Sequence, residues 1–227
     1  STQGVSSAAS DVYKRQAIGQ ASVKITGKGL YKGTKTVNFN IRPATVTKLK
    51  VSSTGEKSVK LSWKKITGAD SYAIYRYDNT SKKWHRIKTV KAVSFTDSGL
   101  ARAKGYSYKV KAVKKSGGKE YISASYSKAV EAVTKPAKAS CTARSAGSGS
   151  IEVSWKAVGG ASGYEIYSSS NGSDYVKSAK VGGSQKSAIV SGFEPYSLRM
   201  VKVRAYKTVN GKTSYGAFSQ AVMVIVR

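Results

Sequence analysis

The stretch Ser58-Val-Lys-Leu-Ser-Trp63 decides the fold, because it recurs 92 residues later as Ser150-Ile-Glu-Val-Ser-Trp155. Tyr72 recurs as Tyr164 at the same offset. Similarity within one chain at a fixed offset indicates repeated structural units. Two homologous units therefore account for most of the 227 residues.

Prolines mark the expected starts of the two units. Pro43 precedes the first repeated segment, and Pro136 precedes the second. We therefore expect one domain at 43–135 and another at 136–227. The linker between them, Thr134-Lys-Pro136, is only a few residues long, so the two domains should have limited freedom.

Within each unit the hydrophobic period is two. Val59, Leu61 and Trp63 alternate with Ser and Lys, which gives a strand one apolar and one polar face. Gly117-Gly118 and Asn210-Gly211 lie between such patterns, where two-residue turns require positive φ. No stretch carries a 3.6-residue apolar stripe. About seven short strands per unit predict an all-β, two-sheet antiparallel sandwich.

The composition is that of a folded protein despite a formal net charge of +29. Hydrophobic residues make up 40% of the chain and aromatic residues 10%, which is enough for a packed core. There is no apolar run of about 18 residues, which excludes a membrane-spanning segment in this sequence. One Cys and one His can form neither an internal disulfide nor a Cys/His zinc site.

Further residues extend the repeat across 43–227. In the first unit they are Leu49, Val51, Leu61-Ser-Trp63, Gly68-Ala-Asp-Ser-Tyr72-Ala-Ile-Tyr75-Arg76, Gly99-Leu100, Tyr106 and Tyr108-Lys-Val110-Lys-Ala112. In the second they are Val153-Ser-Trp155, Gly160-Ala-Ser-Gly-Tyr164-Glu-Ile-Tyr167 and Gly192-Phe193. With these residues, the region resembles two fibronectin type III domains in tandem, of the kind found in secreted and cell-surface proteins of Gram-positive bacteria.

The resemblance implies a fold and a class of role. It implies two tandem seven-stranded, Ig-like antiparallel β-sandwiches. It also implies a non-catalytic function and an extracellular or cell-wall-associated location. Because one fold hosts many functions, the resemblance specifies the fold far better than any ligand.

The second unit departs from the family at one position. Tyr106 follows Leu100 by six residues, and its hydroxyl can hydrogen-bond back to the preceding loop. The corresponding position, six residues after Phe193, is Arg199, which cannot make that bond in the same way. A displaced Tyr196 is the alternative, which leaves the strand register around Arg199 open.

Residues 17–42 are too few to fold alone. The segments 21–26 and 36–41 alternate apolar and polar residues and are separated by glycines, which predicts a β-hairpin. We interpret it as the terminal hairpin of a truncated bacterial Ig-like repeat, with weak order of its own. The alternative is that it pairs with an edge of the first sandwich.

Residues 6–16 read SSAASDVYKRQ, which looks like the in-frame translation of a transposase-type sequencing adapter. We therefore interpret residues 1–16 as an artefactual, disordered tail and exclude them from functional reasoning. The chain is then expected to be a fragment of a larger metagenomic sequence whose true start is missing. The absence of a visible signal peptide accordingly says nothing about secretion.

No residue pattern indicates catalysis. His85 follows Trp84 on a polar strand, and the sequence has no G-x-S-x-G nucleophile motif, so His85 is interpreted as a surface residue. Cys141 aligns with Leu49 and is interpreted as a small buried hydrophobe. The acidic residues are scattered and show no calcium-loop spacing. We therefore expect no enzyme activity, no cofactor and no metal site.

The basic surplus is the most unusual feature of the sequence. Residues 43–135 hold 21 Lys and Arg against 6 Asp and Glu, and residues 136–227 hold 12 against 4. Such a field attracts anions over a Debye length of about 8 Å, although it also simply keeps a surface solvated. Aromatic side chains near these lysines either stack on a ligand or cover the sheet. The candidate residues for polyanion binding are Lys109, Lys111, Lys114, Lys115, Lys119, Lys202 and Arg204.

Two functional hypotheses follow from these observations. The first is a non-catalytic spacer and adhesion module pair of a larger secreted or cell-wall-associated bacterial protein. The alternative is an electrostatic binder of anionic polymers, such as teichoic acid, acidic glycan or extracellular DNA. Expected partners are other domains of the same polypeptide and cell-wall polymers, glycans or surface proteins. No helix is available to read a DNA groove, so no specific nucleic acid is expected, and the chain should be a monomer.

Overall fold

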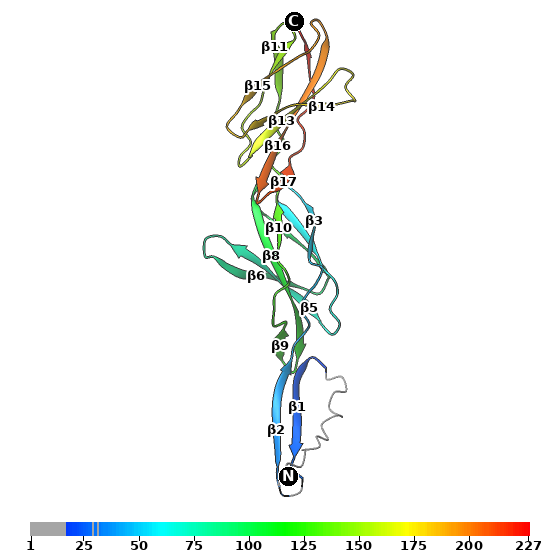
Figure 1. Ribbon diagram of the computed structural model, residues 1–227, viewed down its shortest axis with the longest axis vertical. Coiled ribbons are helices and arrows are strands. Elements are labelled where there is room, and N and C mark those ends of the chain that lie inside the picture. The colour runs from blue at the N-terminus through cyan, green and yellow to red at the C-terminus, as the bar shows by residue number, and fades with distance from the viewer. Residues whose placement is uncertain (1–16, 29, 31) are drawn as a thin grey trace, which may run out of the picture. The chain divides into compact units, whose positions relative to one another are not determined.

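The computed structural model describes residues 17–28, 30 and 32–227, and these residues form strands β1 to β18 joined by turns (Figure 1). The strand pairs of the described residues are antiparallel, as in β1–β2, β12–β15, β13–β16 and β5–β8. The predicted all-β class is therefore confirmed. Among the described residues, no helix is long and apolar enough to cross a membrane. The interpretation of residues 1–16 as an adapter-derived tail falls outside the described residues.

The chain divides into two compact units. The first takes its described residues from the segment ending at Lys50, together with Ser62–Phe95 and Tyr108–Val130. The second comprises Val51–Leu61, Thr96–Ser107 and Glu131–Arg227. This division by compactness does not test the repeat boundaries, so 43–135 and 136–227 stay a prediction.

The second sequence repeat, which lies within the second compact unit, folds into two sheets. One sheet has the order β11-β12-β15, with bounds Thr142–Gly147, Ser150–Ser154 and Ser187–Ser191. The other has the order β14-β13-β16-β17, with β18 also paired to β16. Its strands are β13 (Gly163–Ser169), β14 (Val176–Gly182), β16 (Leu198–Val209), β17 (Lys212–Tyr215) and β18 (Val222–Ile225).

Apolar side chains from both of these sheets form one core. Ile151 and Val153 on β12 are fully buried together with Tyr164 and Ile166 on β13. Trp155 joins them and is only 6% exposed. Because alternate residues point to one side of a strand, the period-two pattern fills the space between the sheets. Each aliphatic side chain in this core contributes about 1.5–3 kcal/mol on burial. Because Trp155 lies in this core between the two sheets, the predicted Trp-centred sandwich is confirmed for the second repeat.

The first repeat has the same strand order as the second. Its three-stranded sheet is β3 (Lys50–Thr54), β4 (Ser58–Ser62) and β7 (Ser94–Ser98). Its second sheet has the order β10-β8-β5-β6, with β9 also paired to β8. These strands are β5 (Ser71–Asp78), β6 (Lys83–Val90), β8 (Gly105–Ser116), β9 (Lys119–Ile122) and β10 (Val130–Val133). The sequence repeat is thus a structural repeat, and the tandem fibronectin type III-like topology is confirmed.

The last strand of each repeat is split into two segments, so each repeat differs from the predicted seven strands at this position. In the second repeat, β17 and β18 both pair with β16. Between them, Ser219 donates its backbone N–H to the Val203 carbonyl, and its hydroxyl accepts the Val203 N–H at 3.0 Å. Ser127 does the same for Val110 in the first repeat, at 2.9 Å. A serine hydroxyl therefore satisfies a buried backbone donor where the ladder is interrupted.

The repeated tyrosine closes a turn in each repeat. Tyr72 packs against Trp63 with ring centroids 5.4 Å apart, and its hydroxyl accepts the Ile66 backbone N–H at 2.9 Å. The hydroxyl of Tyr164 accepts the Val158 N–H at 2.7 Å. Both tyrosines are buried, so the hydroxyl gains a partner where water is excluded.

The predicted corner tyrosine is confirmed in the first repeat. The hydroxyl of Tyr106 accepts the backbone N–H of Ala101 at 2.9 Å. In the second repeat, Arg199 lies against the Phe193 ring, with its guanidinium carbon 5.1 Å from the centroid. Tyr196 does not substitute for the missing tyrosine, because its side chain is 85% exposed. The open register is resolved, since Arg199 lies opposite Val224 in the β16–β18 pair.

The predicted N-terminal hairpin is present. Strands β1 (Gly19–Thr26) and β2 (Thr34–Ile41) form a two-stranded sheet of their own, with Val23 opposite Val37. Neither strand joins a sheet of the first repeat, so the alternative of edge pairing with the sandwich is wrong for the described residues. Its origin in an Ig-like repeat stays a prediction.

Candidate functional site: the cation–aromatic faces

The predicted polar face of β8 carries the first group of candidate residues. Lys109 and Lys111 alternate along this strand with Val110 and Ala112, which are fully buried. The two lysines therefore point to the outer side of the sheet, as the alternation predicts. We call the surface formed by Tyr75, Trp84, Lys109, Lys111 and Tyr126 face 1; all five residues belong to the first compact unit.

In face 1, each lysine lies over an aromatic ring. The Lys109 ammonium is 4.4 Å from the ring centroid of Trp84 and 5.3 Å from that of Tyr126. The Lys111 ammonium is 4.2 Å from the Tyr126 centroid and donates to the Ala124 carbonyl at 3.0 Å. Burial lowers the pKa of Lys111, and repulsion by Arg42 adds to this. Cation–π contacts of this kind hold the ammonium groups beside the rings.

The aromatic side chains of face 1 also pack on one another. Tyr75 and Tyr126 meet edge to face at 4.9 Å, and Trp84 is supported by Tyr77 at 5.3 Å. Every one of these rings is partly exposed. The rings therefore cover the sheet and also remain accessible to a ligand. The two interpretations of these aromatic residues, sheet cover and ligand stacking, are thus compatible.

The other candidate lysines of the first repeat are engaged differently. Lys114 forms an ion pair with Asp70 at 2.9 Å, and hydrogen bonds from Lys114 and the backbone of Lys115 lower the pKa of Asp70. Lys119 is exposed at the start of β9. The sequence did not single out Arg86, which binds Glu120 with hydrogen bonds of 2.9 and 3.1 Å and lowers the pKa of that carboxyl. Pairing already neutralises part of the predicted anion-binding charge.

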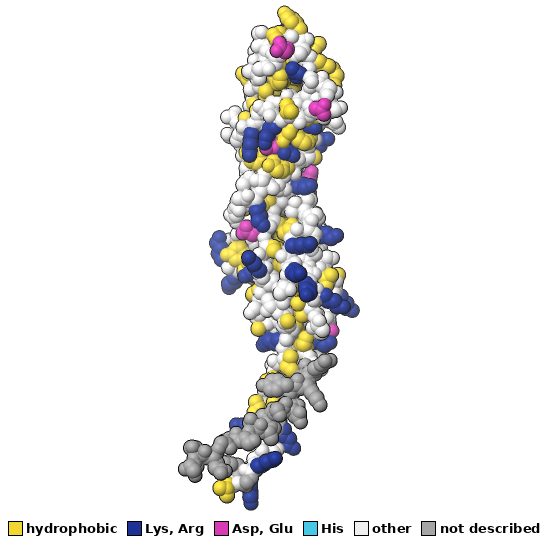
Figure 2. Space-filling view, turned by 45° about the vertical axis from the view of Figure 1, so that its right-hand side comes forward, with side chains coloured by type: hydrophobic (Ala, Val, Ile, Leu, Met, Phe, Trp, Pro, Cys, Tyr) yellow, Lys and Arg dark blue, Asp and Glu magenta, His cyan; other side chains and the backbone are white. Residues whose placement is uncertain are grey.

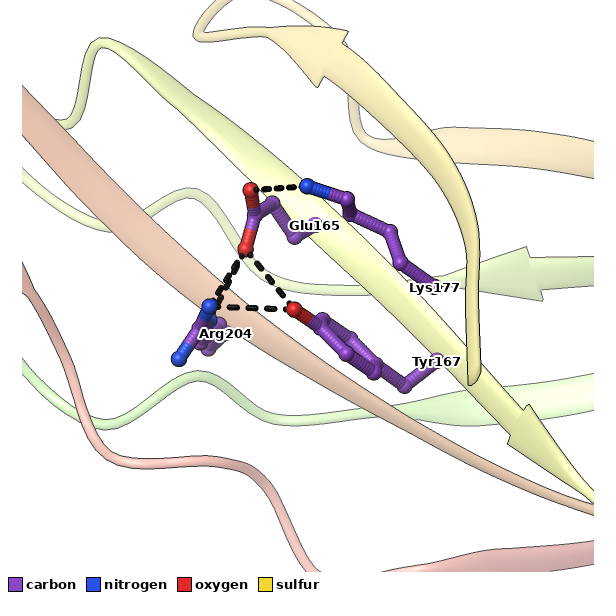
Figure 3. Close-up of polar contacts among 4 residues, drawn as sticks. All are labelled: Glu165, Tyr167, Lys177 and Arg204. Carbon is purple, nitrogen blue, oxygen red and sulfur yellow. Dashed lines mark hydrogen bonds and ion pairs between the residues drawn. The ribbon is translucent and has the colours of Figure 1, made fainter. Parts of the chain in front are cut away.

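The corresponding surface of the second repeat centres on a buried carboxylate (Figure 3). Glu165 is only 1% exposed, and its Oε2 accepts from Arg204 Nε at 2.9 Å and Nη2 at 2.7 Å. Lys177 donates to its Oε1 at 3.1 Å, and Tyr167 donates to its Oε2 at 3.3 Å. Burial by itself would raise the pKa of Glu165, but hydrogen bonds from Arg204 and Lys177 outweigh it and hold the pKa below its ordinary value.

Aromatic rings flank these cations as well. The Arg204 guanidinium carbon is 4.0 Å from the Tyr215 ring centroid, and the Lys202 ammonium is 3.6 Å from that of Tyr175. Phe218 lies beside both cations. We call this surface face 2; it comprises Glu165, Tyr167, Tyr175, Lys177, Lys202, Arg204, Tyr215 and Phe218.

Sequence reasoning missed the role of Glu165, which it counted among scattered acids. The contact could be found only from the register of the strands, because Glu165 lies directly opposite Arg204 in the β13–β16 pair. The position 92 residues earlier is Ala73, and it lies opposite Lys111 in the same way. Face 2 thus carries a carboxylate opposite Arg204, whereas the residue opposite Lys111 is the fully buried Ala73.

His85 and Cys141 do not form a reactive site. His85 Nε2 is 2.9 Å from the Ser81 hydroxyl, but that hydroxyl donates to Asp78 at 2.7 Å. The carboxylate therefore orients the serine rather than the histidine, unlike a catalytic triad. Cys141 is partly exposed rather than fully buried, and it packs against the core while burial raises the pKa of its thiol.

Cavities and metal-ligand clusters offer no alternative among the residues that the structure describes. Two open depressions border β11, and one of them, lined by Arg144 and Glu152, has a volume of about 160 Å³. Neither depression contains a candidate residue. No group of three or more His, Cys, Asp or Glu side chains is arranged to hold a metal ion in the described chain.

Comparisons with known proteins give a partial match. No family model matches this chain. A poly(3-hydroxybutyrate) depolymerase of Ralstonia pickettii is 42% identical over 100 residues, which is 44% of this chain and 18% of that protein. This chain therefore spans less than a fifth of the length of the curated relative that it matches.

Two solved structures are similar in fold at low sequence identity. A two-domain fibronectin type III segment of chicken tenascin is 17% identical, with a TM-score of 0.49 over 80% of this chain and 99% of that chain. The FN1–FN3 domains of chicken CNTN1 are also 17% identical, with a TM-score of 0.42 over 92% of this chain and 77% of that chain.

Proposed function

We propose that the two repeats are non-catalytic spacer and adhesion modules of a larger secreted or cell-wall-associated bacterial protein. The observation that carries this proposal is the duplication itself. The same strand order occurs twice in succession, and several charged side chains, such as Lys114, Arg204 and Lys109, form ion pairs or ring contacts on the sheet faces. The partners of such modules are other domains of the same polypeptide.

The partial match to the depolymerase supports a modular role. The matching segment of about 100 residues is a small part of that protein, as expected for a unit that recurs among different neighbours. Such a pair can position a neighbouring domain relative to a surface, because a β-sandwich with a packed core, such as that of the second repeat, keeps a defined shape. The substrate named for the depolymerase belongs to that protein.

The experiment is to express the complete reading frame, with and without residues 43–227. We expect the intact product in the secreted or wall fraction. We expect the deletion variant to be exported but to show weaker attachment or reduced reach of its other domains. A product of the intact gene that stays in the cytoplasm contradicts the proposal.

Binding of anionic polymers is a second candidate, and the charge of the molecule favours it. Lys and Arg side chains far outnumber Asp and Glu on the surface shown in Figure 2. Outside residues 1–16 the net charge is +28. Affinity for a polyanion should fall steeply as salt is added. Binding releases the counterions condensed on the polyanion, and this release becomes less favourable as the salt concentration rises. Affinity that is independent of salt, or absent at low salt, contradicts this function.

A further inference from the structure

We infer that face 1 binds an acidic polysaccharide whose carboxylates are attached to pyranose rings. This inference rests on the polymer-binding function proposed above and specifies its site and ligand class. Face 1 is the surface of Tyr75, Trp84, Lys109, Lys111 and Tyr126 defined above.

The first argument is uncompensated charge. Among the described residues, no carboxylate forms an ion pair with Lys109 or Lys111. In face 2 the corresponding Arg204 is paired with Glu165 at 2.7 Å. An ammonium group that lacks a protein carboxylate can exchange water for a ligand carboxylate and form a charge-assisted hydrogen bond. Within the described part of the chain, face 1 therefore offers two ammonium groups without a carboxylate partner, whereas face 2 offers one, Lys202, because Glu165 pairs with both Arg204 and Lys177.

The second argument is the ring beside each charge. Lys109 lies between Trp84 and Tyr126, with its ammonium 4.4 and 5.3 Å from their ring centroids. A ligand anion that contacts Lys109 must therefore come close to an aromatic ring. The ligand that suits this arrangement carries an apolar surface immediately next to its anionic group.

This proximity favours a uronate over a phosphodiester. In a uronic acid the carboxylate is bonded directly to the sugar ring, whose C–H groups offer an apolar face to an indole. In a nucleic acid the ribose separates the phosphate from the base. Within face 1 the Tyr75–Tyr126 pair is edge to face, with an interplanar angle of 90°, and the Trp84–Tyr126 pair is tilted by 35° with its centroids 6.5 Å apart. They do not form the row of open parallel plates that successive bases need for stacking.

The test uses the full chain and two polymers, polygalacturonate and single-stranded oligodeoxythymidine, titrated at low salt and followed by calorimetry. The first variant, Lys109→Ala with Lys111→Ala, removes the proposed contacts. The matched control, Lys156→Ala with Lys186→Ala, removes the same charge from exposed positions outside both faces. The variant Trp84→Leu removes the indole without changing the charge. Circular dichroism verifies that each variant is folded.

We expect tighter binding of polygalacturonate than of the oligonucleotide. The Lys109/Lys111 variant should weaken it about tenfold or more, while the control changes it about twofold or less. The Trp84→Leu variant should weaken polygalacturonate binding and leave oligonucleotide binding unchanged.

Each other outcome overturns a defined part of the argument. Equal affinity for both polymers, with no effect of Trp84→Leu, overturns the uronate assignment and leaves polymer binding intact. Equal loss in the Lys109/Lys111 variant and the control overturns face 1 as the site, because the charge then acts diffusely. No binding of either polymer at low salt overturns the polymer-binding function together with this inference.

Discussion

At the scale of single residues, Tyr106 fixes a loop with one hydroxyl group. The variant Tyr106→Phe leaves the Ala101 N–H without its acceptor at 2.9 Å. Loss of one such bond costs about 1 kcal/mol of unfolding free energy. Urea unfolding measures this cost, with Tyr196→Phe as the control because the Tyr196 side chain is 85% exposed. Equal effects of the two variants would contradict the assigned role.

Glu165 makes the stability of the second repeat depend on pH. Its pKa in the folded protein lies below its ordinary value, so the unfolded chain binds the proton more readily. Glu165 therefore contributes stability above its ordinary pKa, and that contribution is lost as pH falls through the folded value. Removing one partner of a fully buried ion pair costs about 3–5 kcal/mol. Because the Arg204 and Lys177 side chains are 22% and 47% exposed and water can solvate them, Glu165→Gln should destabilise the repeat at neutral pH by less, about 1–3 kcal/mol.

Thermal unfolding at neutral and acidic pH measures this effect. The difference between wild type and Glu165→Gln should shrink on acidification. Glu194→Gln, at an exposed position, should behave as wild type at each pH. A difference between wild type and Glu165→Gln that is constant with pH would show that the carboxylate charge is not what stabilises the site.

At the scale of strands, the split last strand depends on one serine in each repeat. The variant Ser219→Ala leaves the buried Val203 N–H without the hydroxyl that accepts it at 3.0 Å. An unsatisfied buried donor costs about 1–3 kcal/mol. The measurement is hydrogen exchange at Val203, which should become faster, with the exposed Ser184→Ala as the control. Unchanged protection at Val203 would mean that the β16 ladder does not need the serine.

The strands were predictable from sequence to the extent that their determinants are local. The alternation of Val59, Leu61 and Trp63 is a property of one strand, and it placed β4 and its face correctly. The outward direction of Lys109 followed from the same rule. The partner of Glu165 did not, because the contact with Arg204 depends on the register between β13 and β16. Register is set by turns and by packing across the whole sheet.

At the scale of the whole molecule, net charge governs association and stability. With +28 outside residues 1–16, copies of the chain repel one another, and each folded chain repels itself. Added salt screens both effects over a Debye length that falls from about 30 Å at 0.01 M to about 8 Å at 0.15 M. We therefore expect the melting temperature to rise over this range while light scattering coupled to size exclusion finds a monomer at both ends. At low salt, polygalacturonate should raise the melting temperature as well, because it neutralises the same charge and binds only the folded face 1. A melting temperature that falls with salt would show that attractive ion pairs such as Glu165–Arg204 outweigh the repulsion. A dimer in size exclusion would contradict the expected monomer.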